Sequence, residues 1–418
     1  MKKVILSTMI ISSSLLSFGQ SAIKYPATKK IDKVDVYFGN SIPDPFRWLE
    51  DDRSAETAEW VKEQNKVTFD YLAAIPFRNT IKARMEKLWN YEKVSAPFKE
   101  GDYTYYYKNN GLQNQSVLYR KDAKGAEELF LDPNTFSKDA TTSLDGVSFS
   151  KDGSLVAYSI SEAGSDWRKV IFIDAKTKQS IGEPLVDVKF SGLSWKGNEG
   201  IFYSSYEKPK GSELSAKTDQ HRLFFHKLGT KQAEDAILFG DQEKRRYVGG
   251  YVSDDNRYLF ISAANSTSGN ELYLKDLSVP NSPIVAIHKG FEYDVDVLDN
   301  IGTTLFIVTN LKAPNKRIVT VDVANPGVEN WKDLIPETEQ VLNPSTGAGY
   351  IFANYMKDAV SVVKQFDYKG KLIRTIALPG VGTASGFGGT AKDKELYFSF
   401  TNYLTPGTTY TFFPDSSK

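Results

Sequence analysis

The sequence predicts an all-β fold, a seven-bladed β-propeller that follows a short two-helix N-terminal segment. One observation is a repeat of about 46 residues, a propeller-type period, in which a polar turn precedes a hydrophobic strand of five or six residues. The other is the number of copies of this repeat. The sequence contains seven, and seven blades can close into the ring of a propeller. The recurring strands are residues 103–107, 155–159, 200–204, 258–262, 304–308, 350–354 and 396–400.

Residues 1–19 are expected to be a secretory signal peptide. Lys2 and Lys3 precede the apolar stretch 4–16, and the small residues Ser17 and Gly19 suit cleavage before Gln20. The apolar stretch is too short and too rich in Ser for a confident membrane span. The chain also has no Cys to carry a lipid anchor. We therefore expect an exported protein, periplasmic or secreted, that is free of the membrane after signal cleavage.

Residues 20–92 are expected to form an extended and helical segment outside the repeat. Ser54 can cap a first helix that ends near Ile75, and Asn79 or Thr80 can cap a second. Two such amphipathic helices cannot make a core by themselves, so they need a partner surface. Their apolar stripes are Trp60, Val61, Val67, Tyr71 and Leu72, then Ile81, Met85, Leu88 and Trp89.

Residues 93–418 are expected to form the propeller, with the last blade incomplete. Strands rich in Tyr, Phe, Val and Ile alternate there with turns of Gly, Asn and Asp. Residues 207–220 are expected to be a mobile loop within one blade. The last blade shows only three strands, at 385–389, 395–400 and 408–413. It would expose an unpaired edge, which natural proteins normally avoid.

Composition argues against nucleic-acid binding and metal chemistry. The chain has 52 Lys and Arg residues and 52 Asp and Glu residues, without a long run of positive or negative charges. It therefore lacks the excess or cluster of positive charge expected of a nucleic-acid-binding protein. The sequence contains no Cys, and its three His residues form no zinc-binding HExxH motif. No cofactor and no metal are expected.

The residues that could indicate catalysis or metal binding each have a simpler structural interpretation. Residues 382–386 approach a nucleophile-elbow motif, but the Ser is misplaced and the segment is predicted to be strand and turn. His221 and His226 would point to opposite faces of a strand, which excludes a shared metal, and we expect a surface or channel pair. No convergent carboxylate pair of a glycosidase is identifiable. The acidic residues that recur at the blade turns are expected to bond their own backbone; they are Asp152, Asp254, Asp255 and Asp299.

Residues 44–51, Asp-Pro-Phe-Arg-Trp-Leu-Glu-Asp, resemble the N-terminal signature of the prolyl oligopeptidase (prolyl endopeptidase) family of serine peptidases. The resemblance covers essentially everything after the signal and is closer to prolyl endopeptidase than to the oligopeptidase that cleaves at basic residues. Further matching segments follow in order at 111–119, 156–159 with 164–167, 189–195, 226–230 and 399–406.

The resemblance implies a two-part enzyme that cleaves short proline-containing peptides. Its parts are a seven-bladed propeller and an α/β-hydrolase domain, which is built from the N-terminal segment and a long C-terminal segment that carries the Ser, Asp and His triad. In this sequence the triad would lie beyond Lys418, so no catalytic residue is assigned and the chain is expected to be inactive alone. The propeller would act as a gate; the alternative is a non-catalytic propeller that binds peptides or a protein partner.

The resemblance also implies three residues of the substrate-cavity wall. Phe190, in a Lys-Phe-Ser motif, would line the distal subsite, and Val248 and Thr267 align with further wall positions. The alternative for Phe190 is a core strand aromatic, because strand alternation alone cannot choose the face.

Overall fold

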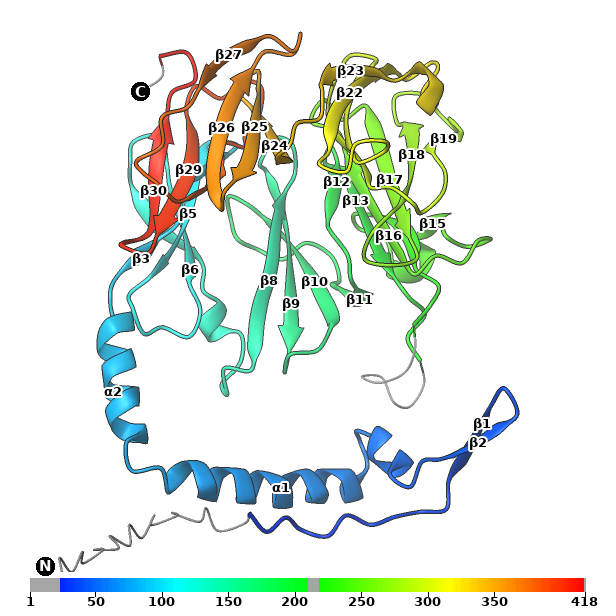
Figure 1. The fold of residues 1–418 in the computed structure, drawn as a ribbon, viewed down its shortest axis with the longest axis vertical. Coiled ribbons are helices and arrows are strands. Elements are labelled where there is room, and N and C mark those ends of the chain that lie inside the picture. The colour runs from blue at the N-terminus through cyan, green and yellow to red at the C-terminus, as the bar shows by residue number, and fades with distance from the viewer. Residues whose placement is uncertain (1–22, 210–217, 417–418) are drawn as a thin grey trace, which may run out of the picture. The chain divides into compact units, whose positions relative to one another are not determined.

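The computed structural model describes residues 23–209 and 218–416 (Figure 1). The predicted signal peptide and the middle of the predicted loop 207–220 lie outside the described residues. The chain divides into two compact units, residues 1–85 and 86–418, which we describe separately.

The first unit begins with a hairpin of β1 (Val34–Tyr37) and β2 (Asn40–Pro43). A short 3-10 helix, η1 (Arg47–Glu50), follows. The Arg47 guanidinium binds the carboxylates of Asp44 and Asp35, and this contact lowers the pKa of Asp35. The charged residues of the Asp-Pro-Phe-Arg signature therefore tie η1 to the hairpin.

Helix α1 (Ala55–Ala73) has the predicted start, because the Ser54 side chain accepts a hydrogen bond of 3.0 Å from the Thr57 backbone N–H. Helix α2 (Arg78–Trp89) begins earlier than expected. The backbone N–H of Ile81 already bonds the carbonyl of Phe77, so Asn79 and Thr80 lie inside the helix and the predicted cap was wrong. No helix within the described residues combines the length and apolar character needed to cross a membrane.

The second unit contains seven antiparallel sheets, which confirms the predicted propeller. Each recurring hydrophobic segment of the sequence forms the second strand of its blade. In blade 1 the first strand is interrupted, and β3 (Lys93–Val94) and β4 (Phe98–Glu100) both pair with β5 (Tyr103–Asn109). The blade continues with β6 (Val117–Lys121) and β7 (Glu127–Leu131), and η2 (Pro133–Thr135) leads to blade 2.

Blades 2 to 6 have four strands each, in chain order. Blade 2 is β8 (Thr142–Phe149), β9 (Leu155–Glu162), β10 (Trp167–Asp174) and β11 (Leu185–Lys189). Blade 3 is β12 (Ser194–Lys196), β13 (Gly200–Ser205), β14 (Arg222–Lys227) and β15 (Ala236–Phe239), with η3 (Gln232–Glu234) before β15. Blade 4 is β16 (Tyr247–Val252), β17 (Tyr258–Ala264), β18 (Glu271–Asp276) and β19 (Ile284–His288).

Blade 5 is β20 (Val295–Ile301), β21 (Thr304–Thr309), β22 (Arg317–Asp322) and β23 (Lys332–Ile335), with η4 (Val328–Asn330) before β23. Blade 6 is β24 (Val341–Gly347), β25 (Tyr350–Lys357), β26 (Val360–Phe366) and β27 (Leu372–Thr375). The last blade is β28 (Thr383–Gly386), β29 (Leu396–Asn402) and β30 (Thr405–Phe412).

The last blade has three strands in the described chain, as predicted, but its first strand is displaced. Strand β28 ends at Gly386, whereas the sequence predicted 385–389. Gly386 (φ +118°) and Phe387 (φ +62°) both leave the extended region there. Phe387 is buried and stacks on Phe352 of blade 6 and on Phe398, with ring centroids 5.4 and 4.6 Å apart. Packing between blades therefore ends this strand.

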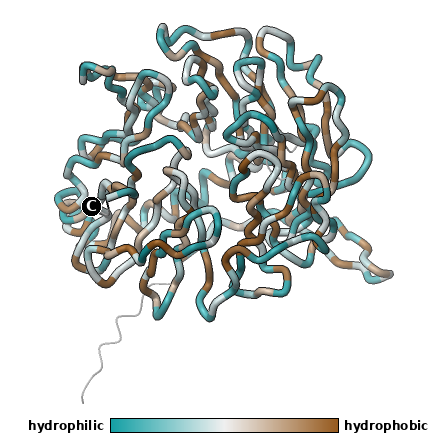
Figure 2. The backbone as a smooth tube through the Cα atoms, turned by 90° about the horizontal axis from the view of Figure 1, so that it is seen from above, coloured by the Kyte–Doolittle hydropathy of each residue, from teal (hydrophilic) through white to brown (hydrophobic). Residues whose placement is uncertain are grey.

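Hydrophobic and hydrophilic segments alternate along the backbone, and many of the loops at the periphery are hydrophilic in the view from above (Figure 2). The largest buried cluster joins blades 4 and 5 and includes Tyr258, Phe260 and Leu305. Many of the aromatic side chains pack in such buried clusters between blades, as the alternation predicted.

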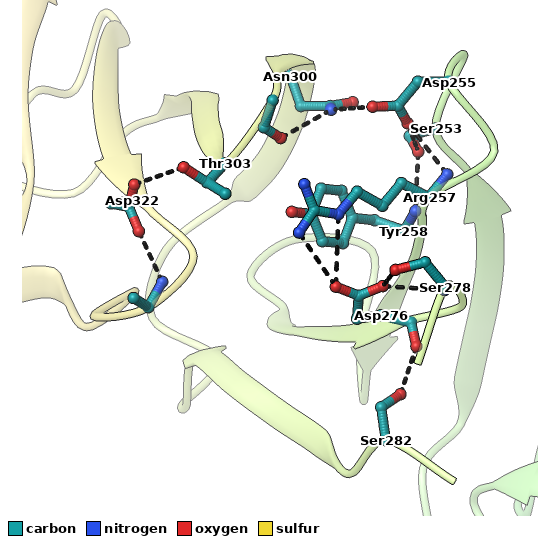
Figure 3. A network of polar contacts seen from close by, with 12 residues as sticks. Ser253, Asp255, Arg257, Tyr258, Asp276, Ser278, Ser282, Asn300, Thr303 and Asp322 are labelled. Carbon is teal, nitrogen blue, oxygen red and sulfur yellow. Dashed lines mark hydrogen bonds and ion pairs between the residues drawn. The ribbon is translucent and has the colours of Figure 1, made fainter. Parts of the chain in front are cut away.

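Asp152, Asp255 and Asp299 accept hydrogen bonds from backbone N–H groups of their own turns, as expected. Asp254 makes no such bond among the described residues, so the expectation was wrong there. The three locally bonded residues also join the next blade: Asp299 accepts from the Tyr368 hydroxyl of blade 6, and Figure 3 shows the contacts of Asp255. Asp255 accepts hydrogen bonds from the Ser253 hydroxyl at 2.6 Å and from the Asn300 amide of blade 5 at 2.8 Å. Asp152 does the same with the Ser150 hydroxyl at 2.8 Å and with the Asn198 amide of blade 3 at 2.6 Å.

Candidate functional site

Phe190 is not a core strand aromatic. It follows the last residue of β11, has a φ of +53° and is 50% exposed. Its ring packs edge-on against Tyr206 and tilted against Tyr247, with centroids 6.3 and 6.2 Å away. The structure therefore places Phe190 at the surface, where blades 2, 3 and 4 meet, and a ligand can reach it.

Val248 and Thr267 lie in different surroundings. Val248, in β16, is buried in the cluster that includes Phe202 and Leu223. It neighbours the Phe190 site through Tyr247, the residue before it. Thr267 is exposed in the turn between β17 and β18. The roles of Phe190, Val248 and Thr267 in a substrate cavity stay predictions.

His221 is buried and connects two other blades by hydrogen bonds. Its predicted place at the surface or in the channel was therefore wrong. Its ring stacks on Tyr206 with centroids 4.2 Å apart. The Val248 backbone N–H donates to Nδ1 at 2.8 Å, so Nε2 carries the proton and donates to the Lys189 carbonyl at 2.9 Å. Burial lowers the pKa of His221 to about 4, against the opposing effect of the bond to Lys189. His221 is therefore neutral at pH 7 and holds the backbone of Lys189 against blade 4.

His226 is also buried and has a separate partner. Its Nδ1 lies 2.8 Å from a carboxylate oxygen of Asp235, and its ring stacks on Phe172 with centroids 5.5 Å apart. Asp235 also accepts a 2.8 Å hydrogen bond from the Tyr203 hydroxyl. These contacts fix blade 3 to blade 2. Sequence reasoning missed both roles because the partners come from other strands.

Charged turns of several blades come together in a second group, which the sequence analysis did not identify. Lys151 of blade 2 reaches past blade 3 and pairs with Asp254 of blade 4 at 3.2 Å. Glu100 of blade 1 lies nearby, and burial raises its pKa to about 7, which Lys151 opposes and Asp254 and Asp393 favour. Each of these residues lies in or next to the turn between the first two strands of its blade. Such turns gather around the axis of a propeller. The position of these charged residues in the blade repeat could therefore have predicted that they lie close together.

Replacing Glu100 with glutamine is expected to stabilise the protein at pH 8 by about 1–2 kcal/mol, after solvent screening of a partly exposed group. The folded-state pKa is raised, so the unfolded state ionises first and stability falls as pH rises from about 4.5 to about 7. The gain should disappear at pH 4. Urea denaturation of both proteins across this range measures it. Glu199→Gln, in the exposed turn of blade 3, is the control, and an equal gain there would contradict the assignment.

A family model described as the prolyl oligopeptidase N-terminal beta-propeller domain matches residues 26–418. The chain belongs to the prolyl oligopeptidase family. A prolyl endopeptidase of Elizabethkingia miricola is 58% identical over 400 residues, which cover 95% of this chain and 57% of that protein. The chain thus spans a little over half the length of this prolyl oligopeptidase relative.

Solved structures of the prolyl oligopeptidase family share the fold. A prolyl endopeptidase studied for the role of inter-domain dynamics in catalysis and specificity superposes with a TM-score of 0.85 at 28% identity, over 94% of this chain and 59% of that chain. A prolyl oligopeptidase B from Galerina marginata, bound to a 25-residue macrocyclization substrate, gives a TM-score of 0.82 at 26% identity, with the same coverage of both chains.

Proposed function

We propose that this chain is the gating propeller of a secreted prolyl endopeptidase, whose complete form cleaves short peptides after proline through a serine nucleophile. The observation that carries the proposal is the 58% identity to a prolyl endopeptidase along 95% of this chain. The 43% of the relative that this chain does not cover would supply the hydrolase domain with its Ser, Asp and His triad.

The propeller would restrict which substrates reach the active site. A catalytic cavity between two domains must open to admit substrate and close to exclude water. The ion pair between Lys151 and Asp254, which links the non-adjacent blades 2 and 4, would narrow one end of a propeller channel. Folded proteins would be excluded there, while Phe190, Val248 and Thr267 would contribute to the cavity wall at the opposite face.

Two features of the described residues support a missing partner domain. Met85 and Trp89 on α2 are each 63% exposed, and exposed apolar surface of this kind favours burial against another element. The open edge of β30 borders a groove of about 590 Å³ lined by residues that include Ile376, Phe398 and Tyr410. We propose that the hydrolase domain covers α2 and that the chain leading to it completes the last blade.

A fusion enzyme tests this function. Residues 20–418 would be joined to the part of the Elizabethkingia miricola enzyme that this chain does not match. We expect the fusion to cleave a chromogenic Gly-Pro peptide, to be blocked by a serine-directed phosphonate and to leave a folded protein with a surface proline intact. A fusion that folds and binds the phosphonate but leaves the peptide uncleaved would contradict the proposal.

Export of the protein is part of the proposal and rests on the sequence of residues 1–19. Mass spectrometry of the protein from the periplasm or medium should give an N-terminus at Gln20 or a few residues later. Retention of Met1 in a cell-associated protein would contradict export.

A further inference from the structure

Three basic side chains meet aromatic rings at one face of blades 2 to 4. Trp167 begins β10, Phe190 follows β11, Tyr206 follows β13 and Tyr247 begins β16. Because neighbouring strands run antiparallel, these strand ends all lie at the same propeller face. We name the group the cationic aromatic patch, and it consists of Trp167, Lys189, Phe190, Tyr206, Lys208, Arg246 and Tyr247.

Lys189 is the central cation of the patch. The residue is only 6% exposed, and its ammonium lies 4.9 Å from the ring centroid of Trp167 and 5.1 Å from that of Phe190. No carboxylate of the described chain is within ion-pair distance of it. A buried ammonium without an anion is unfavourable, and the aromatic faces offset only part of this.

The ammonium of Lys189 lies directly behind an exposed ring. Its nitrogen is 5.1 Å from the ring centroid of Phe190, and Phe190 is 50% exposed. An anion at the propeller face would therefore reach the ammonium by displacing this one ring.

The patch carries an excess of positive charge. Lys208 is paired with Asp187 at 2.6 Å. Arg246 is exposed and lies 5.7 Å from the ring centroid of Tyr247, and no described carboxylate pairs with it. Among the described residues, three cations of the patch therefore lie near one carboxylate.

The backbone that presents Lys189 is held in place before any ligand binds. Asp187 and Phe190 both have left-handed φ values, +54° and +53°, a strained conformation that surrounding contacts must maintain. His221 donates to the Lys189 carbonyl, and the Ser205 hydroxyl donates to the Asp187 carbonyl at 2.5 Å. Such preorganisation lowers the entropic cost of ligand binding.

We propose that Lys189 binds a carboxylate of the peptide substrate, so that the cationic aromatic patch selects peptides with an anionic group on the N-terminal side of the proline. The inference rests on the proposed function, because the resemblance places Phe190 at the distal subsite. The ammonium would donate to the carboxylate, and the rings of Phe190 and Tyr247 would pack against the apolar part of the peptide.

Calorimetric titration of residues 20–418 with two matched peptides tests the proposal. The probes are N-succinyl-Gly-Pro-amide, which carries a carboxylate, and N-succinamoyl-Gly-Pro-amide, its neutral counterpart of nearly equal shape. We expect the anionic peptide to bind about tenfold more tightly, in the range of a charge-assisted hydrogen bond. The preference should shrink in 1 M salt, where screening is strong.

Variants separate the role of the charge from a structural role. Lys189→Met keeps the buried stem and should remove the preference, and Lys189→Arg should retain it. Lys364→Met is the matched control, because Lys364 also places its ammonium beside an aromatic ring, 5.3 Å from the centroid of Tyr355, but on blade 6. Thermal melting curves establish that each variant is folded.

Equal affinity for the two peptides, or a preference that survives in Lys189→Met, would overturn the inference while leaving the proposed function intact. Absence of binding by either peptide would also overturn the inference, while the fusion enzyme tests the proposed function separately.

Discussion

Replacing His221 with phenylalanine is expected to destabilise the propeller by roughly 3–5 kcal/mol. Phenylalanine keeps the ring that stacks on Tyr206 but cannot accept from the Val248 N–H or donate to the Lys189 carbonyl. Two buried backbone groups lose their partners, and each such group costs about 1–3 kcal/mol. Urea denaturation measures the change.

His288→Phe is the matched control for this prediction. His288 is also nearly buried, and its Nε2 has no hydrogen-bond partner among the residues that the structure describes. Removing an unsatisfied polar atom is expected to be neutral or slightly stabilising. Equal destabilisation by both substitutions would mean that ring volume, rather than the two hydrogen bonds, accounts for the effect.

His221 also gives the protein a pH dependence of definite sign. Its folded-state pKa of about 4 lies below the ordinary value of 6.5, so its contribution is complete above pH 6.5 and is lost as pH falls to 4. The shift corresponds to about 3 kcal/mol. The ionisation of Glu100 has the opposite effect on the free energy of unfolding over nearly the same pH range. His221→Phe should therefore leave a protein that loses stability as pH rises from about 4.5 to 7, and Glu100→Gln one that gains it.

Replacing Gly153 with alanine is expected to cost more than about 3 kcal/mol, because it would force blades 1 and 2 apart. Gly153 has a φ of +71°, and an added Cβ would lie 2.6 Å from Cα of Gly101 and 2.7 Å from the carbonyl carbon of Glu100. All of these atoms are backbone, so no side chain can rotate away. Thermal melting of the variant measures the loss.

Gly229→Ala separates the steric clash from the strain of the positive φ. Gly229 has a φ of +82°, and nothing lies within 4 Å of a Cβ added there. We expect a loss of about 1–2 kcal/mol from the left-handed conformation alone. Similar losses at Gly153 and Gly229 would show that blades 1 and 2 are not in tight backbone contact at this turn.

The blades could be predicted from sequence because their determinants are local. Each second strand is a hydrophobic run beside a turn, and residues 155–159 and 258–262 therefore predicted β9 and β17. The Ser54 cap of α1 is equally local, since its bond reaches only Thr57. In contrast, β28 ends at Gly386 because Phe387 packs on Phe352 of blade 6, a contact that no local pattern contains.

The site was predicted less completely for the same reason. The Lys-Phe-Ser motif indicated Phe190, but the surroundings of Lys189 depend on Trp167, which lies 22 positions earlier and faces it across the β10 and β11 pair. Period-two geometry treated His221 as part of a strand, whereas the residue precedes β14 and bonds two other blades. Contacts between blades decide the burial of such polar residues.

Hydrolysis of a chromogenic Gly-Pro substrate by purified residues 20–418 tests the central claim most directly, since the claim assigns substrate recognition and gating to this chain and the chemistry to a hydrolase domain outside it. We predict no hydrolysis above background. Hydrolysis that a serine-directed phosphonate abolishes would place a nucleophile within this chain and contradict the account.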